Sequence, residues 1–152
     1  MKKKVLKSLL AIVCLLSGTD VSAYDFEVDG FYYDVISMKD GTCRVTKGNS
    51  QYTGDIVIPS KFNHDDKTWT VMEIDDYAFS GCNILTSVEI GNSVITIGRD
   101  AFSNCSRLTS VEIGNFVTTI SSYAFSNCSS LMSVTIPNSV TTIGGWAFEN
   151  CI

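Results

Sequence analysis

The sequence is poor in proline and in histidine, a residue that many catalytic and metal sites use. Its 152 residues include only two prolines and a single histidine, His64. One histidine cannot build a zinc site of several histidines, and a histidine-based triad would depend on His64, with no marked nucleophile elsewhere. We therefore expect no enzyme activity, no catalytic residues, no bound metal and no cofactor.

Basic side chains are also scarce, with 11 lysines and arginines against 16 acidic residues. Four of the lysines and one aspartate fall within residues 1–23, so the remainder has 7 basic and 15 acidic side chains and a formal charge of −8. Nucleic-acid binding needs clustered positive charge to neutralise phosphates. The composition thus predicts no nucleic-acid partner and no attraction to an anionic membrane surface.

No apolar run reaches the ~20 residues that a membrane-spanning helix needs. The main apolar stretch, residues 6–16, follows the lysines at positions 2–4 and precedes a small-residue pattern at positions 21–23. This order is typical of a secretory signal peptide. Residues 1–23 are therefore predicted to be removed, which leaves a secreted or cell-surface protein without membrane insertion.

Internal repetition is what the sequence has in abundance. Each repeat begins with Ala-Phe, has a cysteine three residues after the phenylalanine, and continues into a Val-x-Ile segment. The repeats begin at Ala78, Ala101, Ala124 and Ala147, with a constant period of 23 residues. Residues 101–123 and 124–146 agree at 15 of 23 positions. A fixed period of this length predicts an architecture of stacked repeats.

Within one repeat, the apolar residues follow a strand pattern. Val111 and Ile113 are two residues apart, which predicts that they face inward while Ser110, Glu112 and Gly114 face outward. The β-branched side chains suit such a strand.

The rest of the repeat is expected to close the coil. Val117 and Ile120 form a second inward-facing pair. Ala101, Phe102 and Cys105 form an apolar cluster that we expect in a short helical turn or 3₁₀ segment. Because each turn is stacked on the next, the repeated phenylalanines are predicted to form one column: Phe79, Phe102, Phe125 and Phe148.

The predicted fold is a β-rich repeat solenoid, a right-handed leucine-rich-repeat coil with 23-residue turns and an N-terminal β-hairpin cap. Asp29-Gly30 and Asp40-Gly41 lie between β-prone runs and predict the turns of the cap. The expected divisions are a signal peptide at 1–23, a β-meander cap at 24–55, a degenerate first repeat with an insertion at 56–77, and repeats at 78–100, 101–123, 124–146 and, in part, 147–152. The last repeat is short, for which truncation of a longer chain is the favoured explanation over association.

The repeat frame resembles the BspA-like class of leucine-rich repeat, which occurs in secreted and surface proteins of bacteria and some parasitic protists. Residues 124–144, AFSNCSSLMSVTIPNSVTTIG, carry the resemblance most clearly, and it extends over residues 56–152. Gly91 and Gly114 replace the proline of the frame, and Phe116 occupies a small-residue position. The resemblance implies an adhesion-like binding role.

The recurring cysteines are expected to be buried free thiols. Stacking would place their Cα atoms ~4.8 Å apart, but parallel side chains fit disulfide geometry poorly, and a linear column cannot surround a tetrahedral zinc. The four are Cys82, Cys105, Cys128 and Cys151. Cys43, outside the frame, is the one candidate for an exposed thiol.

Three further patterns have both functional and structural interpretations. Asn104 and Asn127 stand in N-x-S glycosylation sequons, but they belong to the frame and are expected to bind backbone groups at a turn. His64 is expected to be solvated. Glu89 and Glu112 could suggest the carboxylate pair of a glycosidase, yet a flat exposed strand face makes a solvated surface the better interpretation.

The remaining functional candidate is a surface. An outward column of Val57, Glu89, Glu112 and Thr135 is predicted, with threonines on the second strand at Thr96, at Thr118 or Thr119, and at Thr141 or Thr142. Tyr77, Tyr123 and Trp146 precede successive Ala-Phe pairs, with Arg99-Asp100 interrupting the row, and serve either as exposed anchors or as packing. The possible binding surface consists of Ser87, Glu89, Ser110, Glu112, Ser133, Thr135, Tyr123 and Trp146. The expected partner is an extracellular protein or glycan. The alternative is a passive structural or spacer segment of a larger envelope protein.

Overall fold

The computed structural model describes residues 24–151, which form eleven strands and no helix. The strands are β1 (Phe26–Val28), β2 (Phe31–Ser37), β3 (Thr42–Thr46), β4 (Gly54–Ile58), β5 (Lys61–His64), β6 (Lys67–Ile74), β7 (Leu85–Ile90), β8 (Thr96–Ile97), β9 (Ser110–Glu112), β10 (Thr119–Ile120) and β11 (Thr142–Ile143). The predicted signal peptide, residues 1–23, lies outside the described residues.

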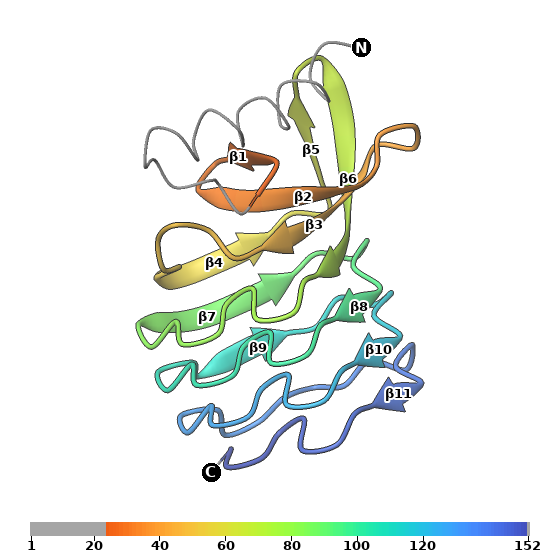
Figure 1. Ribbon diagram of the computed structural model, residues 1–152. Helices are drawn as coiled ribbons and strands as arrows, with labels where there is room; N and C mark the ends of the chain where they lie inside the picture. The colour runs from red at the N-terminus through yellow and green to blue at the C-terminus, as the bar shows by residue number, and fades with distance from the viewer. Residues whose placement is uncertain (1–23, 152) are drawn as a thin grey trace.

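Two sheets share these strands. An eight-stranded sheet has the order β1-β2-β3-β6-β8-β10-β11, with β5 also paired to β6, and a three-stranded sheet has the order β4-β7-β9. The chain passes from one sheet to the other and back in each turn, moving steadily away from the N-terminal strands (Figure 1). Neighbouring strands of the repeat region pair in parallel because every turn runs in the same direction.

The strand register confirms the predicted solenoid. In the eight-stranded sheet, Glu73 lies opposite Thr96, Thr96 opposite Thr119, and Thr119 opposite Thr142. Each partner is 23 residues further along the chain, so one sequence repeat is one turn of the coil. Val88 and Val111 lie in β7 and β9 and are buried, as predicted for Val111, whereas in residues 134–136 only Thr135 forms a bridge.

The corner at residues 101–105 consists of reverse turns, so the predicted helical turn is wrong. Ser103 N donates to Asp100 O at 3.1 Å, as in a tight turn, but Phe102 N donates to Ala124 O of the next turn at 2.7 Å. A helix needs consecutive amides to donate within the segment. Here alternate amides donate along the solenoid instead, so a helix cannot form.

The predicted column of phenylalanines is present and runs the length of the coil. The ring centroids of Phe79, Phe102, Phe125 and Phe148 are separated by 4.8, 5.1 and 5.2 Å in turn. The first three side chains are fully buried. Tyr52 adds one more ring at the N-terminal end, 4.5 Å from Phe79. The column is therefore a continuous apolar core that begins in the cap.

A column of free thiols lies beside the rings, as predicted, with Cys82, Cys105 and Cys128 buried but Cys151 only half-buried. Cys105 Sγ donates to Phe79 O and Cys128 Sγ donates to Phe102 O, both at 3.2 Å. Each thiol thus binds a main-chain carbonyl of the preceding turn. This periodic contact explains why a small polarisable donor recurs at the position.

The expectation that Cys43 is exposed is wrong. Its side chain has no exposed surface, because β3 lies in the sheet interior between β2 and β6, and its Sγ approaches Thr70 O at 3.6 Å. Burial raises the pKa of Cys43 to about 12. Burial also raises the pKa of Cys82.

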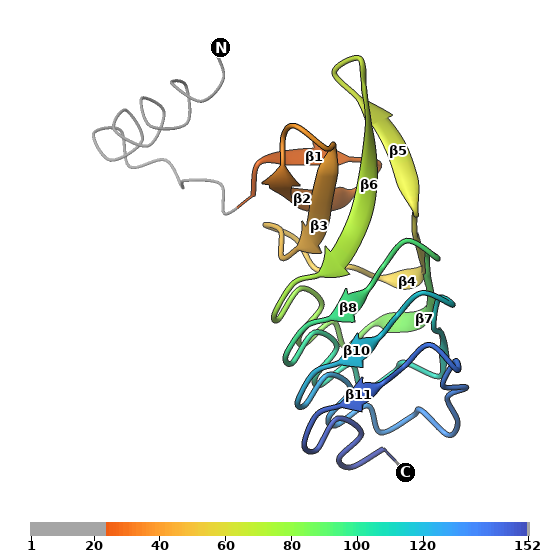
Figure 2. The same cartoon turned by 90° about the vertical axis from the view of Figure 1, so that its right-hand side faces the viewer.

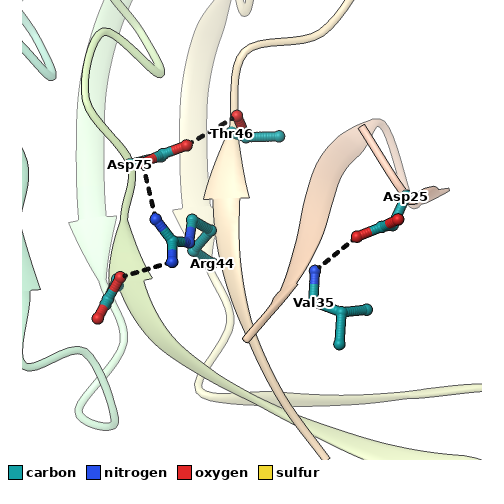
Figure 3. Close-up of polar contacts among 6 residues, drawn as sticks. Asp25, Val35, Arg44, Thr46 and Asp75 are labelled. Atoms are coloured by element: carbon teal, nitrogen blue, oxygen red, sulfur yellow. Dashed lines mark hydrogen bonds and ion pairs between the residues drawn. The ribbon is translucent and has the colours of Figure 1, made fainter. Parts of the chain in front are cut away.

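The cap is an antiparallel meander that continues the solenoid rather than resting on it. Asp29 and Gly30 have φ of 51° and 80° and connect β1 to β2 as the Asp-Gly pair predicts, and Gly41 has φ of 66° between β2 and β3. Val35 N donates to Asp25 Oδ2 at 2.9 Å within this meander (Figure 3). Because β3 pairs in parallel with β6, the cap forms one end of the eight-stranded sheet.

Ion pairs connect the cap to the first turn. Arg44 of β3 contacts Asp75 Oδ1 at 3.2 Å and Glu73 Oε2 at 3.6 Å, and Thr46 Oγ1 donates to Asp75 Oδ2 at 3.3 Å (Figure 3). The side chains of these ion pairs are about a third exposed, so each pair contributes little stability by itself. Together they hold β3 and β6 in register at the junction.

The insertion in the first repeat is the hairpin of β5 and β6, which extends beyond the cap in Figure 2. Asp65 and Asp66 at its tip both have positive φ, 50° and 58°, as a two-residue hairpin turn requires. The expectation of a solvated His64 is wrong, because its half-buried ring stacks on Phe26 with 4.8 Å between centroids. The hairpin therefore packs on the cap through aromatic contacts.

Gly114 is buried, so the prediction that it faces outward is also wrong. A Cβ at this position would lie 2.7 Å from the main-chain oxygens of Ile90 and Gly91 in the preceding turn. The close approach of two backbones leaves room only for glycine in this turn.

We predict that Phe102→Ala lowers the free energy of unfolding by ~3–5 kcal/mol, because it opens a cavity between two stacked rings. Urea denaturation checks this. Phe116→Ala is the matched control, since the Phe116 side chain is 66% exposed, and its effect should stay within ~0.5 kcal/mol. Equal loss in both variants would contradict the importance of the column.

We also predict that Cys43, Cys82, Cys105 and Cys128 resist alkylation in the native protein and react after unfolding, as measured by peptide mass spectrometry.

Burial of the thiols also predicts a pH dependence of stability. The unfolded thiols ionise near pH 9, whereas burial keeps Cys43 protonated up to a pKa of about 12. The folded state therefore binds more protons in this range, and stability should fall as pH rises above about 9. Rapid native labelling of Cys43 would contradict its burial.

Candidate binding surface

The predicted outward column lies on the three-stranded sheet. Val57 is opposite Glu89, Glu89 opposite Glu112, and Glu112 forms a parallel bridge with Thr135. All four side chains are exposed, because the strand periodicity directs their neighbours into the core. The column therefore crosses four successive turns on one face, as the repeat alignment predicts.

A second column of small residues runs beside it. Ser87 of β7 is opposite Ser110 of β9, and Ser133 follows in the next turn. Asp55 precedes this column, since it is opposite Ser87 in the register and accepts hydrogen bonds from Ser87 Oγ at 2.6 Å and Thr86 Oγ1 at 2.8 Å. These bonds hold the pKa of Asp55 below its usual value.

Asp55 was absent from the sequence-based set of surface residues. The signal was available, because Asp55 directly precedes the Ile56-Val57-Ile58 segment that matches the strand of later repeats. The pairing of β4 with β7 shifts register between Gly54 and Asp55. Extending the repeat pattern one residue before Ile56 would have placed Asp55 opposite Ser87.

Glu89 and Glu112 carry like charges at neighbouring positions. Directly paired residues of adjacent strands stand ~4.8 Å apart, so the two carboxylates repel each other. Neither side chain makes a hydrogen bond or an ion pair with any other residue in the range 24–151. Nothing within the described chain neutralises this pair.

A hollow of about 200 Å³ adjoins the two carboxylates. It is lined by the same four positions in three successive turns, residues 57–60, 89–92 and 112–115. We call it the corner hollow, because it lies where the three-stranded sheet ends and each turn bends. Asn115 N donates to Asn92 Oδ1 at 2.8 Å along its wall, so the corner is fixed by contacts between turns.

Tyr123 and Trp146 do not share a sheet with these residues. They follow β10 and β11 of the eight-stranded sheet, and their rings stack face to face at 5.3 Å. Arg99 fills the interruption in the row, with its guanidinium carbon 5.6 Å from the Tyr123 ring. The ring faces thus contact neighbouring turns, but Tyr77 and Trp146 are 47% and 63% exposed, so the structure supports both the packing and the exposed-anchor interpretation.

The threonines of the eight-stranded sheet divide into two sets. Thr96, Thr119 and Thr142 pair along the sheet. Thr118 Oγ1 and Thr141 Oγ1 donate to main-chain oxygens of the preceding turn at 3.4 and 3.2 Å. The second set therefore stabilises the stack rather than presenting free hydroxyl groups.

The two sequon asparagines form a ladder with Asn150 of the last repeat. Asn104, Asn127 and Asn150 have φ of 61°, 60° and 57°, a conformation that asparagine tolerates better than most residues. Asn127 Nδ2 donates to Asn104 Oδ1 at 3.3 Å, and Asn150 Nδ2 donates to Asn127 Oδ1 at 2.8 Å. A structural role is supported, although the side chains bind one another rather than the backbone groups expected.

In the part of the chain that the structure describes, no group of three or more histidine, cysteine, aspartate or glutamate side chains is arranged to hold a metal ion. Within residues 24–151, no helix has the length and apolar character needed to span a bilayer.

Solved structures with the same fold come from several bacteria. A leucine-rich repeat protein from Bacteroides ovatus is 32% identical, with a TM-score of 0.78 over 84% of this chain, and this chain spans 33% of that protein. One from Bacteroides capillosus is 30% identical, with a TM-score of 0.69 over 78% of this chain and 86% of that one. The T. pallidum leucine-rich repeat protein is 26% identical, with a TM-score of 0.67 over 84% of this chain and 67% of that one.

No curated protein matches the chain. The model of the BspA type leucine rich repeat region matches residues 58–152 with six copies. This range begins within β4 and includes every turn of the coil. The chain therefore belongs to the BspA type leucine-rich repeat family.

Proposed function

We propose that this protein is an exported binding module that acts in the medium or on the cell surface and contacts an extracellular protein or glycan. The observation that carries the proposal is the outward column of the three-stranded sheet, in which Glu89 and Glu112 stand in register without a partner among residues 24–151. Unpaired like charges on a sheet face cost stability, so a partner that neutralises them would gain free energy on binding.

The shape of the surface supports contact with an extended partner. The column crosses four turns, from Val57 to Thr135, and a solenoid presents such columns as continuous surfaces. The corner hollow, at about 200 Å³, is smaller than the ~300–1,000 Å³ of typical small-molecule pockets. These dimensions suit a macromolecule that spreads over the face more than a captured metabolite.

Export is supported by the sequence pattern of residues 1–23, which combines positive charge, an apolar stretch and a small-residue cleavage pattern. The free thiols do not oppose it, because Cys82, Cys105 and Cys128 are buried and their geometry disfavours disulfides. A secreted or cell-surface location follows from this proposal.

We predict that the purified protein binds specific components of a glycan and extracellular-matrix protein array, and that Glu89→Gln with Glu112→Gln lowers the signal at least about tenfold. Glu27→Gln with Glu149→Gln is the charge-matched control, because both residues are exposed and lie outside the three-stranded sheet. An unchanged signal in the double variant would place the binding surface elsewhere. No signal above background for the folded protein would favour the passive spacer role instead.

A further inference from the structure

Phe116 departs from the repeat in a way that folding does not explain. It is the third residue of a tight turn closed by Val117 N donating to Gly114 O at 3.1 Å. The same turn occurs in the preceding and following repeats, where Ser93 and Ser139 occupy this position. Serine is a common turn residue. The Phe116 side chain is 66% exposed, so it adds little to the core.

An exposed aromatic ring at a position suited to serine adds no folding stability, and it increases the exposed apolar surface. Departures from local rules without a structural benefit tend to mark interaction sites, and exposed aromatic residues are frequent anchors of interfaces. The location supports this interpretation, because Phe116 directly follows Gly114 and Asn115, which line the corner hollow.

The chemistry of the hollow selects a cation. Glu89 and Glu112 stand next to each other on its wall, and both lack a partner within residues 24–151. A volume of about 200 Å³ accepts one side chain rather than a drug-sized molecule. A neutral sugar would leave the repulsion between the carboxylates in place, and an anionic ligand would increase it.

Arginine fits this combination best among natural side chains. Its planar guanidinium can hydrogen-bond to two carboxylates at once, and its flat face packs on aromatic rings. We propose that the corner hollow and Phe116 together bind an arginine side chain in an extended basic segment of a partner protein. Glu89 and Glu112 bind the guanidinium, and Phe116 covers the aliphatic stem or the flat face of the group.

This inference rests on the proposed function, of which it specifies the partner and the contact. Experiment can refute the arginine inference without refuting the proposed binding function. If the array identifies a neutral glycan or an acidic protein whose binding is independent of Phe116, the module remains a binding protein and the arginine inference is wrong.

The test uses a fluorescein-labelled twelve-residue peptide of alternating arginine and serine, with lysine–serine and glutamine–serine peptides for comparison, measured by fluorescence anisotropy. We expect the order arginine, lysine, glutamine in decreasing affinity. Phe116→Ser should weaken arginine-peptide binding about tenfold or more, while its melting temperature stays within about 3 °C of the wild type. Glu89→Gln with Glu112→Gln should abolish the binding.

Two control variants complete the test. Ile84→Ser replaces another exposed apolar residue with the serine found at the equivalent position 130, and Glu27→Gln with Glu149→Gln removes two exposed negative charges elsewhere. Both should keep the wild-type affinity within about twofold. Phe116→Leu, which preserves an apolar side chain, covers the case in which the serine variant folds poorly, and it should also weaken binding.

The inference is overturned if the arginine peptide binds no better than the glutamine peptide. It is also overturned if Phe116→Ser and Phe116→Leu bind as the wild type does, or if Glu27→Gln with Glu149→Gln weakens binding as much as Glu89→Gln with Glu112→Gln, since binding would then follow net charge alone.

Discussion

The hydrogen bonds between successive turns are the constraint on which the rest of the structure depends. They require equivalent residues to lie one strand spacing apart, ~4.8 Å, along the axis of the coil. Once that spacing is set, like stacks on like: Phe102 on Phe125, Cys105 beside Cys128, and Asn104 on Asn127. The same constraint that stacks the apolar core also places Glu89 beside Glu112, where stacking is unfavourable. The core and the candidate surface therefore have one physical origin.

Stability in such a coil comes from contacts between neighbouring turns, because a single turn cannot bury both of its faces. The cap provides those contacts at the N-terminal end. Its Tyr52 ring continues the phenylalanine column, and the hydroxyl of Tyr52 donates to Thr46 O at 3.1 Å while accepting from Tyr32 N at 3.1 Å. Arg44 connects the same region to the first turn through Asp75. The cap thus joins both the interior and the sheet of the repeats.

Residues that differ from the repeat pattern fall into two groups, those that packing explains and those that it does not. Asp100 stands where the neighbouring repeats have an aromatic ring, and the guanidinium of Arg99 beside it lies over the Tyr123 ring. The Gly114 backbone lies so close to Ile90 that only glycine fits there. Phe116 has no such explanation, because its ring faces solvent at a corner where serine suits the turn. Departures that the packing accounts for need no partner, whereas Phe116, for which the packing does not account, adjoins the corner hollow.

The sequence by itself determined the coil, its 23-residue turn, the phenylalanine column and the outward column of Val57, Glu89, Glu112 and Thr135. It could do so because a repeated residue meets its own copy, so periodicity alone specifies contacts. The tertiary structure decided the contacts between segments that are not copies of one another. Cys43 is buried because β6 pairs with β3 and places Val71 opposite it, and His64 is partly covered because Phe26 stacks on it. It also decided that Tyr123 and Trp146 lie on another sheet from the glutamates, and that the residues at 101–105 form reverse turns. Such contacts depend on neighbours outside the repeat and on which acceptor each amide binds. The spacing of residue types along the chain does not specify either of these.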